Sequence, residues 1–333
     1  MNYILNKENE IYYECNWSSD NALFLCLEGD KFVITDGRYT LDAKEKASAE
    51  VIESRDLIKK AKELILKYRP KKLTIDPLNW NKKDYNELLK VVNLKDEEHF
   101  SHKKRVIKSK NELEIIKKAA KKGAKAFDEF AKKIKIGADE FELGFEFKKI
   151  LTKRGKRDIS FEPIVAINEN AAKPHALPMR KTLKKGDLLL LDAGIKYKRY
   201  CSDRTRTIFI GKNISMSKKQ KFPKKIQKIY DVVLRAQEAA IKAVRVGIKA
   251  KELDKIARDI ITKAGYGKYF VHSLGHGVGL DIHEWPYINS KNEIILKEGM
   301  VFTIEPGIYI PGEFGIRIED MVAINYDSKA EIL

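Results

Sequence analysis

The first hundred residues alternate short apolar runs with longer amphipathic segments. This pattern predicts two strands, two helices and a third strand, at residues 21–27, 31–35, 40–49, 55–68 and 71–77. The first two strands flank Glu28-Gly29-Asp30, a sequence typical of a hairpin turn. A polar, basic stretch over residues 96–110 then resembles a linker. We therefore expect a small α/β domain over residues 1–107 and a second domain over residues 108–333.

The second region contains a faint internal repeat. Two glycines and a leucine recur at identical spacing in two sets, which are Gly137, Leu143 and Gly155, then Gly247, Leu253 and Gly265. In both sets the glycines bracket a segment with helical spacing, where glycine suits turns and caps. Such a duplication predicts two halves that face each other across an approximate two-fold axis.

Each copy of the repeat continues with an apolar strand that ends in an acidic residue. Asp192 follows a run of four leucines, and Glu305 takes the same place in the second copy. A second acid, Asp203 or Glu319, follows on the returning strand. A buried carboxylate is costly unless a cation or a donor meets it. One such acid is usually a turn or strand-end residue, but four in two matching hairpins predict a shared centre.

A glycine-rich segment supplies histidines to the same region. His272 and His276 lie four residues apart, which on a helix would suggest a zinc pair. Three glycines within residues 275–279 favour a tight loop instead. A lone histidine there is ordinarily a hydrogen-bonded loop residue. However, four of the six histidines lie near motif positions in this region, namely His175, His272, His276 and His283.

One imidazole and four carboxylates make a ligand set that is rich in oxygen. The set consists of Asp192, Asp203, His276, Glu305 and Glu319. It suits two divalent ions, such as Mn²⁺, Co²⁺, Fe²⁺ or Zn²⁺, better than a single structural zinc. Two ions about 3.5–4 Å apart support hydrolysis, because together they activate water and polarise a carbonyl.

Composition bears on whether the protein binds nucleic acid, inserts into a membrane or is exported. The formal net charge is +18, but the lysines are scattered along helices beside 48 acidic residues, and no nucleic-acid motif accompanies them. No run approaches the ~18 apolar residues that a membrane span needs, and the first residues turn polar too early for a signal peptide. Three cysteines without a CxxC pair fit a reducing compartment. We expect a cytoplasmic protein that binds neither nucleic acid nor membrane.

Taken together, these motifs resemble those of the proline-specific pita-bread metallopeptidases, the Xaa-Pro dipeptidases (prolidases) and Xaa-Pro aminopeptidases. The matching runs are Pro174–Ala176, Leu191–Gly194, Tyr200–Thr207, His272–Leu280, His283–Glu284, Gly299–Tyr309 and Gly315–Asp320. They extend over residues 109–333, and a weaker match in the first region covers Ile34–Tyr39. The resemblance implies an α+β fold, with a pita-bread catalytic domain of duplicated helix-hairpin halves after a smaller α/β domain.

The resemblance also implies a role for each site residue. Asp192 would chelate one metal, His276 and Glu305 the other, and Asp203 and Glu319 would bridge them. A metal-bridging hydroxide would attack the scissile carbonyl, with Glu305 as the general base. His175 and His283 would steady the carbonyl oxygen and the developing anion, and His272 would line the proline pocket. Arg317 would either hold a ligand in place or meet the substrate carboxylate, although a plain strand salt bridge also fits it.

Xaa-Pro dipeptides are the substrates that this resemblance favours, because the short chain and compact leading domain are similar to microbial prolidases. The alternative is an Xaa-Pro aminopeptidase that acts on longer peptides. Methionine aminopeptidases share the fold but usually lack such a leading domain and the ending Arg317–Asp320. Creatinase-like and non-catalytic binding proteins lose metal ligands, and none is lost here. The expected cofactors are two divalent ions per subunit, with Mn²⁺ first, and the expected assembly is a homodimer.

Overall fold

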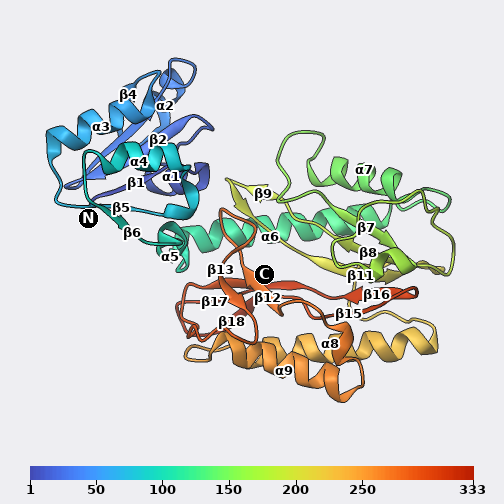
Figure 1. The fold of residues 1–333 in the computed structure, drawn as a ribbon. Coiled ribbons are helices and arrows are strands. Elements are labelled where there is room, and N and C mark those ends of the chain that lie inside the picture. The colour runs from blue at the N-terminus through green and yellow to red at the C-terminus, as the bar shows by residue number, and fades with distance from the viewer. The chain divides into compact units, whose positions relative to one another are not determined.

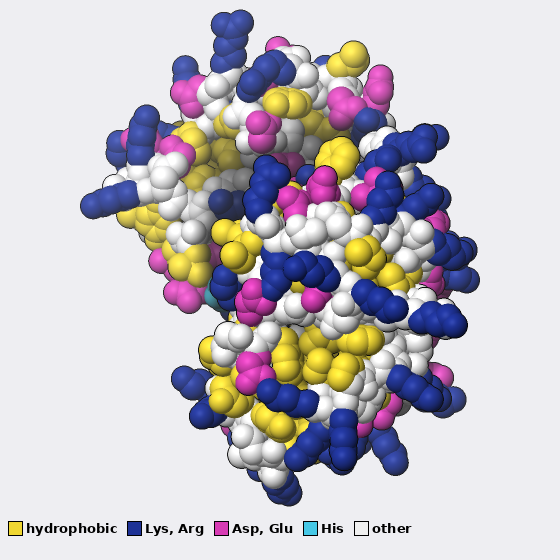
Figure 2. All heavy atoms as spheres, turned by 90° about the vertical axis from the view of Figure 1, so that its right-hand side faces the viewer, with side chains coloured by type: hydrophobic (Ala, Val, Ile, Leu, Met, Phe, Trp, Pro, Cys, Tyr) yellow, Lys and Arg dark blue, Asp and Glu magenta, His cyan; other side chains and the backbone are white.

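The computed structural model describes all 333 residues, and they form two compact units, Met1–Arg105 and Val106–Leu333. On the face drawn in Figure 2, Lys and Arg side chains are spread among acidic and apolar ones rather than gathered in a single patch. None of the helices combines the length and the apolar character that a membrane span requires.

The first unit is built around a six-stranded sheet with the order β4-β3-β2-β1-β5-β6. Its strands are β1 (Tyr3–Leu5), β2 (Ala22–Leu27), β3 (Asp30–Thr35), β4 (Glu50–Glu53), β5 (Leu73–Ile75) and β6 (Leu94–Asp96). Its helices are α1 (Glu8–Cys15), α2 (Thr40–Lys46), α3 (Leu57–Tyr68), the 3₁₀ turn η1 (Pro77–Asn79), α4 (Lys82–Leu89) and α5 (Phe100–Arg105).

The predicted hairpin is confirmed as β2 paired antiparallel with β3. Side chains alternate between the two faces of β2, as the pleat requires. Leu25 packs in one core with Leu64 of α3, while Phe24 packs in another with Ile11 of α1. The sheet therefore has helices on both faces, and the unit has the α/β character that the pattern predicted.

The prediction of a linker over residues 96–110 is wrong, because most of this stretch is ordered structure. It contains α5, and the following helix already begins at Lys110. Phe100 is buried, and its ring lies 5.2 Å from that of Tyr3 in the core of the first unit. One aromatic anchor thus orders a stretch that polarity alone assigned to a loop.

The second unit repeats a pattern of two helices followed by strands. Its first half contains α6 (Lys110–Ala131), α7 (Glu140–Leu151), β7 (Ile164–Ile167), the 3₁₀ turn η2 (Asn168–Ala172), β8 (Leu188–Asp192), β9 (Lys196–Tyr197), β10 (Tyr200–Cys201) and β11 (Thr205–Phe209). Its second half contains α8 (Lys224–Ala243), α9 (Ala250–Lys263), the 3₁₀ turn η3 (Gly267–Tyr269), β12 (Gly275–Gly277), β13 (Glu284–Ile288), β14 (Val301–Ile304), β15 (Gly307–Ile310), β16 (Phe314–Arg317), β17 (Asp320–Ile324) and β18 (Ala330–Ile332).

The strands of the two halves lie between their helices. Figure 1 shows α6 and α7 on one side of the strands and α8 and α9 on the other. The main sheets have the orders β11-β8-β7 and β13-β12-β14-β17-β18, and β15 pairs with β16. Each half has its own hydrophobic core between helices and sheet.

Two glycines start the strands that lead to the predicted acids. Gly186 and Gly299 have φ angles of +97° and +79°, which residues with a Cβ rarely adopt. In each half the chain makes this tight turn and then enters β8 or β14. The spacing between the glycine and the acid in the sequence is thus the length of one strand.

Candidate metal centre and substrate pocket

Strand register brings the four acidic residues together in two pairs. Asp192 ends β8 opposite Thr205 of β11, so Asp203 lies just beyond the same end of this hairpin. In the second half, Ile304 pairs with Asp320, so Glu305 and Glu319 lie beside each other at the matching end of β14 and β17. All four carboxylates line one cavity.

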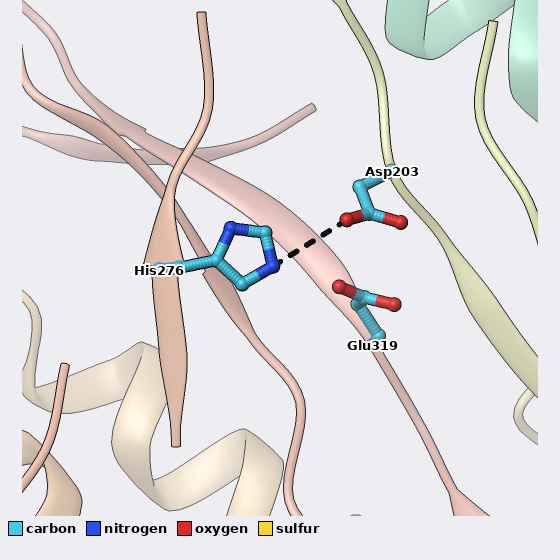
Figure 3. Close-up of side chains that lie close together, drawn as sticks. All are labelled: Asp203, His276 and Glu319. Atoms are coloured by element: carbon cyan, nitrogen blue, oxygen red, sulfur yellow. Dashed lines mark ion pairs between the residues drawn. The ribbon is translucent and has the colours of Figure 1, made fainter. Parts of the chain in front are cut away.

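His276 approaches these carboxylates from β12 (Figure 3). Its Nδ1 lies 3.1 Å from the carbonyl oxygen of Gly277, so Nδ1 carries the proton and donates it there. The unprotonated Nε2 then faces Asp203 Oδ2 at 3.6 Å and Glu305 Oε1 at 3.3 Å. Burial, reinforced by the nearby His283, lowers the pKa of His276 to about 3. The ring is therefore neutral at pH 7 and offers a lone pair, as a metal ligand must.

The donor set fits divalent cations. Ligand atoms of Asp203, His276 and Glu319 all lie within 4.8 Å of one another (Figure 3). One oxygen of each of three carboxylates is buried without a hydrogen-bond partner, namely Asp192 Oδ1, Asp203 Oδ1 and Glu319 Oε1. Buried acceptors in protein interiors normally have hydrogen-bond partners, so these three oxygens are suited to bind a cation.

Electrostatics supports this conclusion. Burial, together with repulsion between the carboxylates, raises the pKa of Asp203 and of Glu319 well above the ordinary value. Burial also raises the pKa of Glu305 to about 8, although Arg317 acts against this. Carboxylates that repel one another in a dry site become stable as anions when positive charge is added.

Arg317 lies at the edge of the acidic cluster and is buried. Its Nη2 donates to Asp192 Oδ2 at 2.6 Å, and its Nε donates to Thr205 Oγ1 at 3.0 Å. The Thr205 hydroxyl in turn donates to Glu319 Oε2 at 2.6 Å. Arg317 Nη1 donates to Pro174 O and to the Tyr309 hydroxyl. These contacts favour a role in holding ligands, while contact with a substrate carboxylate stays a prediction.

His272 is linked to Arg317 through Tyr309. Because a guanidinium can only donate, the Tyr309 hydroxyl accepts from Arg317 and donates its own proton to His272 Nε2, 2.8 Å away. His272 Nδ1 then donates to Ser273 O at 2.7 Å. Burial and the charge of Arg317 lower the pKa of His272 to about 4, so this ring is also neutral at pH 7.

The cavity around this cluster has a volume of about 480 Å³. Every residue that the sequence singled out lines it, namely Asp192, Asp203, His276, Glu305, Glu319, His175, His272, His283 and Arg317. The ring of His283 stands edge-on to that of His276, with centroids 4.3 Å apart. The volume is in the range of small-molecule sites.

Comparison with known proteins identifies the family. Residues 114–326 match the model of metallopeptidase family M24. This chain belongs to that family.

Relatives of this M24 member include the Xaa-Pro dipeptidase of Pyrococcus furiosus, which is 47% identical over 220 residues. That match covers 66% of this chain and 61% of the relative, so the chain spans about three fifths of the curated relatives it matches. Among solved structures, an Xaa-Pro dipeptidase from Bacillus anthracis superposes with a TM-score of 0.90 at 32% identity and covers 99% of this chain and 92% of that one. An X-Pro aminopeptidase from Thermotoga maritima gives 0.89 at 32%, with coverage of 99% and 94%.

The likeness to these M24 structures, and to the prolidase from Pyrococcus furiosus (TM-score 0.88, 35% identity, 99% of this chain and 95% of that one), confirms the predicted pita-bread fold. The sequence did not reveal which residues form hydrogen bonds to the predicted ligands and hold them in place. Thr205 and Tyr309 lie within longer motif runs, and nothing in those runs marks them as partners of the ligands. Tyr309 lies between two isoleucines in its strand, whereas Thr205 is flanked by arginines and carries no such signal.

A second buried network of this M24 member lies behind Glu319. Asp320 accepts from Arg206 Nη2 at 2.5 Å, from Lys218 Nζ at 2.9 Å and from Gln237 Nε2 at 3.0 Å. Arg206 also donates to the carbonyl oxygen of Glu319 at 2.6 Å. Burial acts to raise the pKa of Asp320, but Arg206 and Lys218 outweigh it and hold the pKa below the ordinary value. This network joins β11 of the first half to β17 of the second.

The apolar wall of the pocket was also missed. Phe161, Ile164, Val271, Ile282 and Tyr287 line the cavity together with the polar residues. They come from three stretches of chain, at residues 161–164, 271 and 282–287, and no motif marks them. Only the folded structure gathers them.

Proposed function

We propose that this protein hydrolyses the Xaa-Pro peptide bond and that Xaa-Pro dipeptides are its main substrates. The observation that carries the proposal is a cavity in which buried carboxylate oxygens without partners stand beside neutral His276 and three further histidines. The relatives named Xaa-Pro dipeptidase support the choice of bond. An Xaa-Pro bond is a tertiary amide without an N–H, so peptidases that grip the backbone N–H cannot use it.

We propose Asp192, Asp203, His276, Glu305 and Glu319 as the ligands of two divalent ions, with Mn²⁺ first and Co²⁺, Fe²⁺ or Zn²⁺ as substitutes. When bound, such ions act as a Lewis acid toward the carbonyl and lower the pKa of water. We propose Glu305 as the general base, because its carboxylate lines the same cavity as the other ligands and can take up a proton from water there. Asp192 is held for its role by Arg317.

The remaining proposed roles belong to substrate contacts. His175 and His283 donate hydrogen bonds to the carbonyl oxygen as negative charge develops on it, which lowers the barrier most when the donors are fixed in advance. His272, neutral and held between Ser273 and Tyr309, lines the space for the proline ring. The apolar residues Phe161, Ile164 and Val271 complete the wall.

A second candidate function is an Xaa-Pro aminopeptidase activity on longer peptides, and one observation favours it. Arg317 already donates hydrogen bonds to four protein groups, which belong to Asp192, Thr205, Pro174 and Tyr309. A dipeptide brings a free carboxylate next to its proline, whereas a longer peptide brings an amide there. Because Arg317 already has partners, it has little left to offer a substrate carboxylate, and the pocket binds an amide at that position with less loss of interaction.

Paired substrates separate the two functions. Ala-Pro, Ala-Pro-Ala and the control Ala-Ala are compared with protein that has been loaded with Mn²⁺, and kcat/KM is measured for each. Turnover of Ala-Pro above Ala-Pro-Ala supports the dipeptidase. The reverse order supports the aminopeptidase, and cleavage of neither proline peptide refutes both. Elemental analysis of the loaded protein is expected to give about two ions per chain.

We further propose that the protein acts as a cytoplasmic homodimer on small peptides. Its three cysteines are buried and unpaired, which is typical of a reducing compartment. Sedimentation equilibrium of the full chain measures the mass directly, and a mass of one chain at micromolar concentration would refute the dimer.

A further inference from the structure

Two segments that carry pocket histidines each rest on a buried carboxylate from a neighbouring helix. Glu140 is the first residue of α7 and Asp254 lies in α9, and both are 0% exposed. Neither residue lines the pocket. The proposed chemistry does not use them, so their burial calls for another explanation, since an isolated buried carboxylate is costly.

Glu140 holds both ends of the segment that carries His175. Its Oε1 accepts from the backbone N–H of Ile167 at 2.7 Å, just before the segment begins. Its Oε2 accepts from the backbone N–H of Met179 at 2.6 Å, after the segment ends, and from Asn170 Nδ2 at 2.7 Å within it. Both oxygens are thus used, and every bond goes to this one stretch of chain.

Internal contacts make the clamped segment rigid. Asn170 Nδ2 also donates to the carbonyl oxygen of Leu177 at 2.9 Å, so the stretch closes on itself around Pro174 and His175. Arg317 reaches Pro174 O from the metal centre. His175 itself is exposed at the pocket. Its position therefore depends on the backbone beneath it and hence on Glu140.

Asp254 does the same for the segment that carries His272, with Arg258 as an intermediary. Asp254 and Arg258 form a two-pronged pair, with Nε to Oδ2 at 2.8 Å and Nη2 to Oδ1 at 2.9 Å. Arg258 then donates to Phe270 O at 3.0 Å and to His272 O at 2.9 Å. Asp254 Oδ1 accepts from Leu274 N at 3.2 Å.

The two clamps occupy related places in the repeated fold. α7 and α9 are the second helices of the two halves, and the repeat spacing matches Glu140 with Ala250. Asp254 lies four residues after Ala250, which is one helical turn further along the same face. Each half thus carries its own buried acid on its second helix, at a different turn.

We propose that Glu140 and Asp254 are positioning residues that fix His175 and His272, and that each controls a different kinetic step. This inference rests on the proposed peptidase function. His175 steadies charge that develops during the reaction, so a loosened His175 segment lowers kcat. His272 lines the proline pocket before and after the reaction, so a loosened His272 segment raises KM.

The test compares Glu140→Gln and Asp254→Asn with matched controls on the same helices. Glu142→Gln keeps the capping box of α7, and Asp259→Asn changes a partly exposed acid of α9 that pairs with Lys255. We expect Glu140→Gln to lower kcat about tenfold or more with KM within about twofold, because small displacements of a catalytic group are costly. We expect Asp254→Asn to raise KM by a similar factor with kcat retained.

Two readouts do not depend on turnover. Amide hydrogen exchange is expected to speed up in residues 168–178 only in Glu140→Gln and in residues 270–274 only in Asp254→Asn. The affinity for Mn²⁺, measured by calorimetry, is expected to stay within about twofold of the wild type, because no ligand of the centre bonds to either acid. If Glu140→Gln does not fold, Asn170→Ala removes one of the clamp's bonds, and Arg258→Lys weakens the second clamp in the same way.

The outcomes separate this inference from the function beneath it. An active wild type with variants whose kcat and KM change together, or not at all, overturns the inference alone. An inactive wild type refutes the proposed function, and hydrogen exchange then decides whether the clamps exist. Faster exchange throughout the chain in either variant would reduce its acid to a general stabiliser and would also overturn the inference.

Discussion

Arg317 and Asp192 form a buried ion pair in which Nη2 lies 2.6 Å from Oδ2, and it leaves the other oxygen of Asp192 without a partner. The guanidinium thus orients the carboxylate and aims one oxygen into the acidic cluster. Through Thr205 the same arginine reaches Glu319. The guanidinium of Arg317 therefore orients two carboxylates, Asp192 and Glu319, that come from different halves of the fold.

Arg317→Lys is expected to weaken Mn²⁺ binding and to lower kcat/KM, each about 10- to 100-fold, since groups that orient metal ligands contribute on that scale. Lysine keeps the charge but has no fork with which to reach Asp192, Thr205 and Tyr309 together. Calorimetric titration with Mn²⁺ measures the affinity. Arg180→Lys, at an exposed arginine, serves as the control and should behave like the wild type. Unchanged Mn²⁺ affinity in Arg317→Lys would argue against the holding role.

Asp203→Asn and Glu319→Gln test the proposed bridging ligands. Each change removes one negative charge from the centre of the cluster, and we expect activity to fall at least about a thousandfold as metal is lost. Elemental analysis after gel filtration gives the metal content, and Ala-Pro hydrolysis gives the rate. A variant that stays fully metallated and active would contradict the assignment of that residue.

Removal of metal is expected to make stability depend on pH. The pKa of Glu305 is about 8 in the folded state and lies near its ordinary value when unfolded, so the folded protein binds the extra proton between these values. The free energy of unfolding of the metal-free protein must therefore fall as pH rises from 6.5 to 8. His272 and His276, whose folded pKa values are lowered, act in the opposite direction, but only below pH 6.5.

Thermal unfolding of chelator-treated and Mn²⁺-loaded protein across this pH range checks the prediction. The metal-free protein should lose melting temperature toward pH 8, and loading should restore most of it there, because the ion replaces the proton. Glu305→Gln should reduce the pH dependence of the metal-free profile without abolishing it, because the pKa values of Asp203 and Glu319 are raised as well. A melting temperature that rises with pH in the metal-free protein would be inconsistent with the raised pKa.

Asp320→Asn is expected to destabilise the fold by about 3–5 kcal/mol, because it leaves the buried Arg206 without its anion. Lys218 loses the same partner. Urea unfolding of the metal-free protein measures the change. Asp327→Asn, at an exposed acid of the same half, is the control and should shift the midpoint little. Equal stability of the two variants would show that the network contributes little.

Much of this molecule follows from local pattern. The hairpin β2–β3, the duplicated helices and the strand-end acids were all predicted, because side-chain periodicity and turn residues act over a few neighbours. The stretch at residues 96–110 was not, because its order depends on a contact between Phe100 and Tyr3 that are far apart in the chain.

By itself, the sequence determined which residues could form a metal centre, since four carboxylates occur in two matching hairpins and a histidine lies in a glycine-rich segment. Only the tertiary structure decided what each of them touches. In the folded chain Arg317 pairs with Asp192. Hydrogen bonds to Tyr309 and Gly277 fix the tautomers of His272 and His276. Glu140 and Asp254 lie behind the segments that carry the pocket histidines. Hydrogen bonds between distant segments have no period in the sequence, so only packing reveals them.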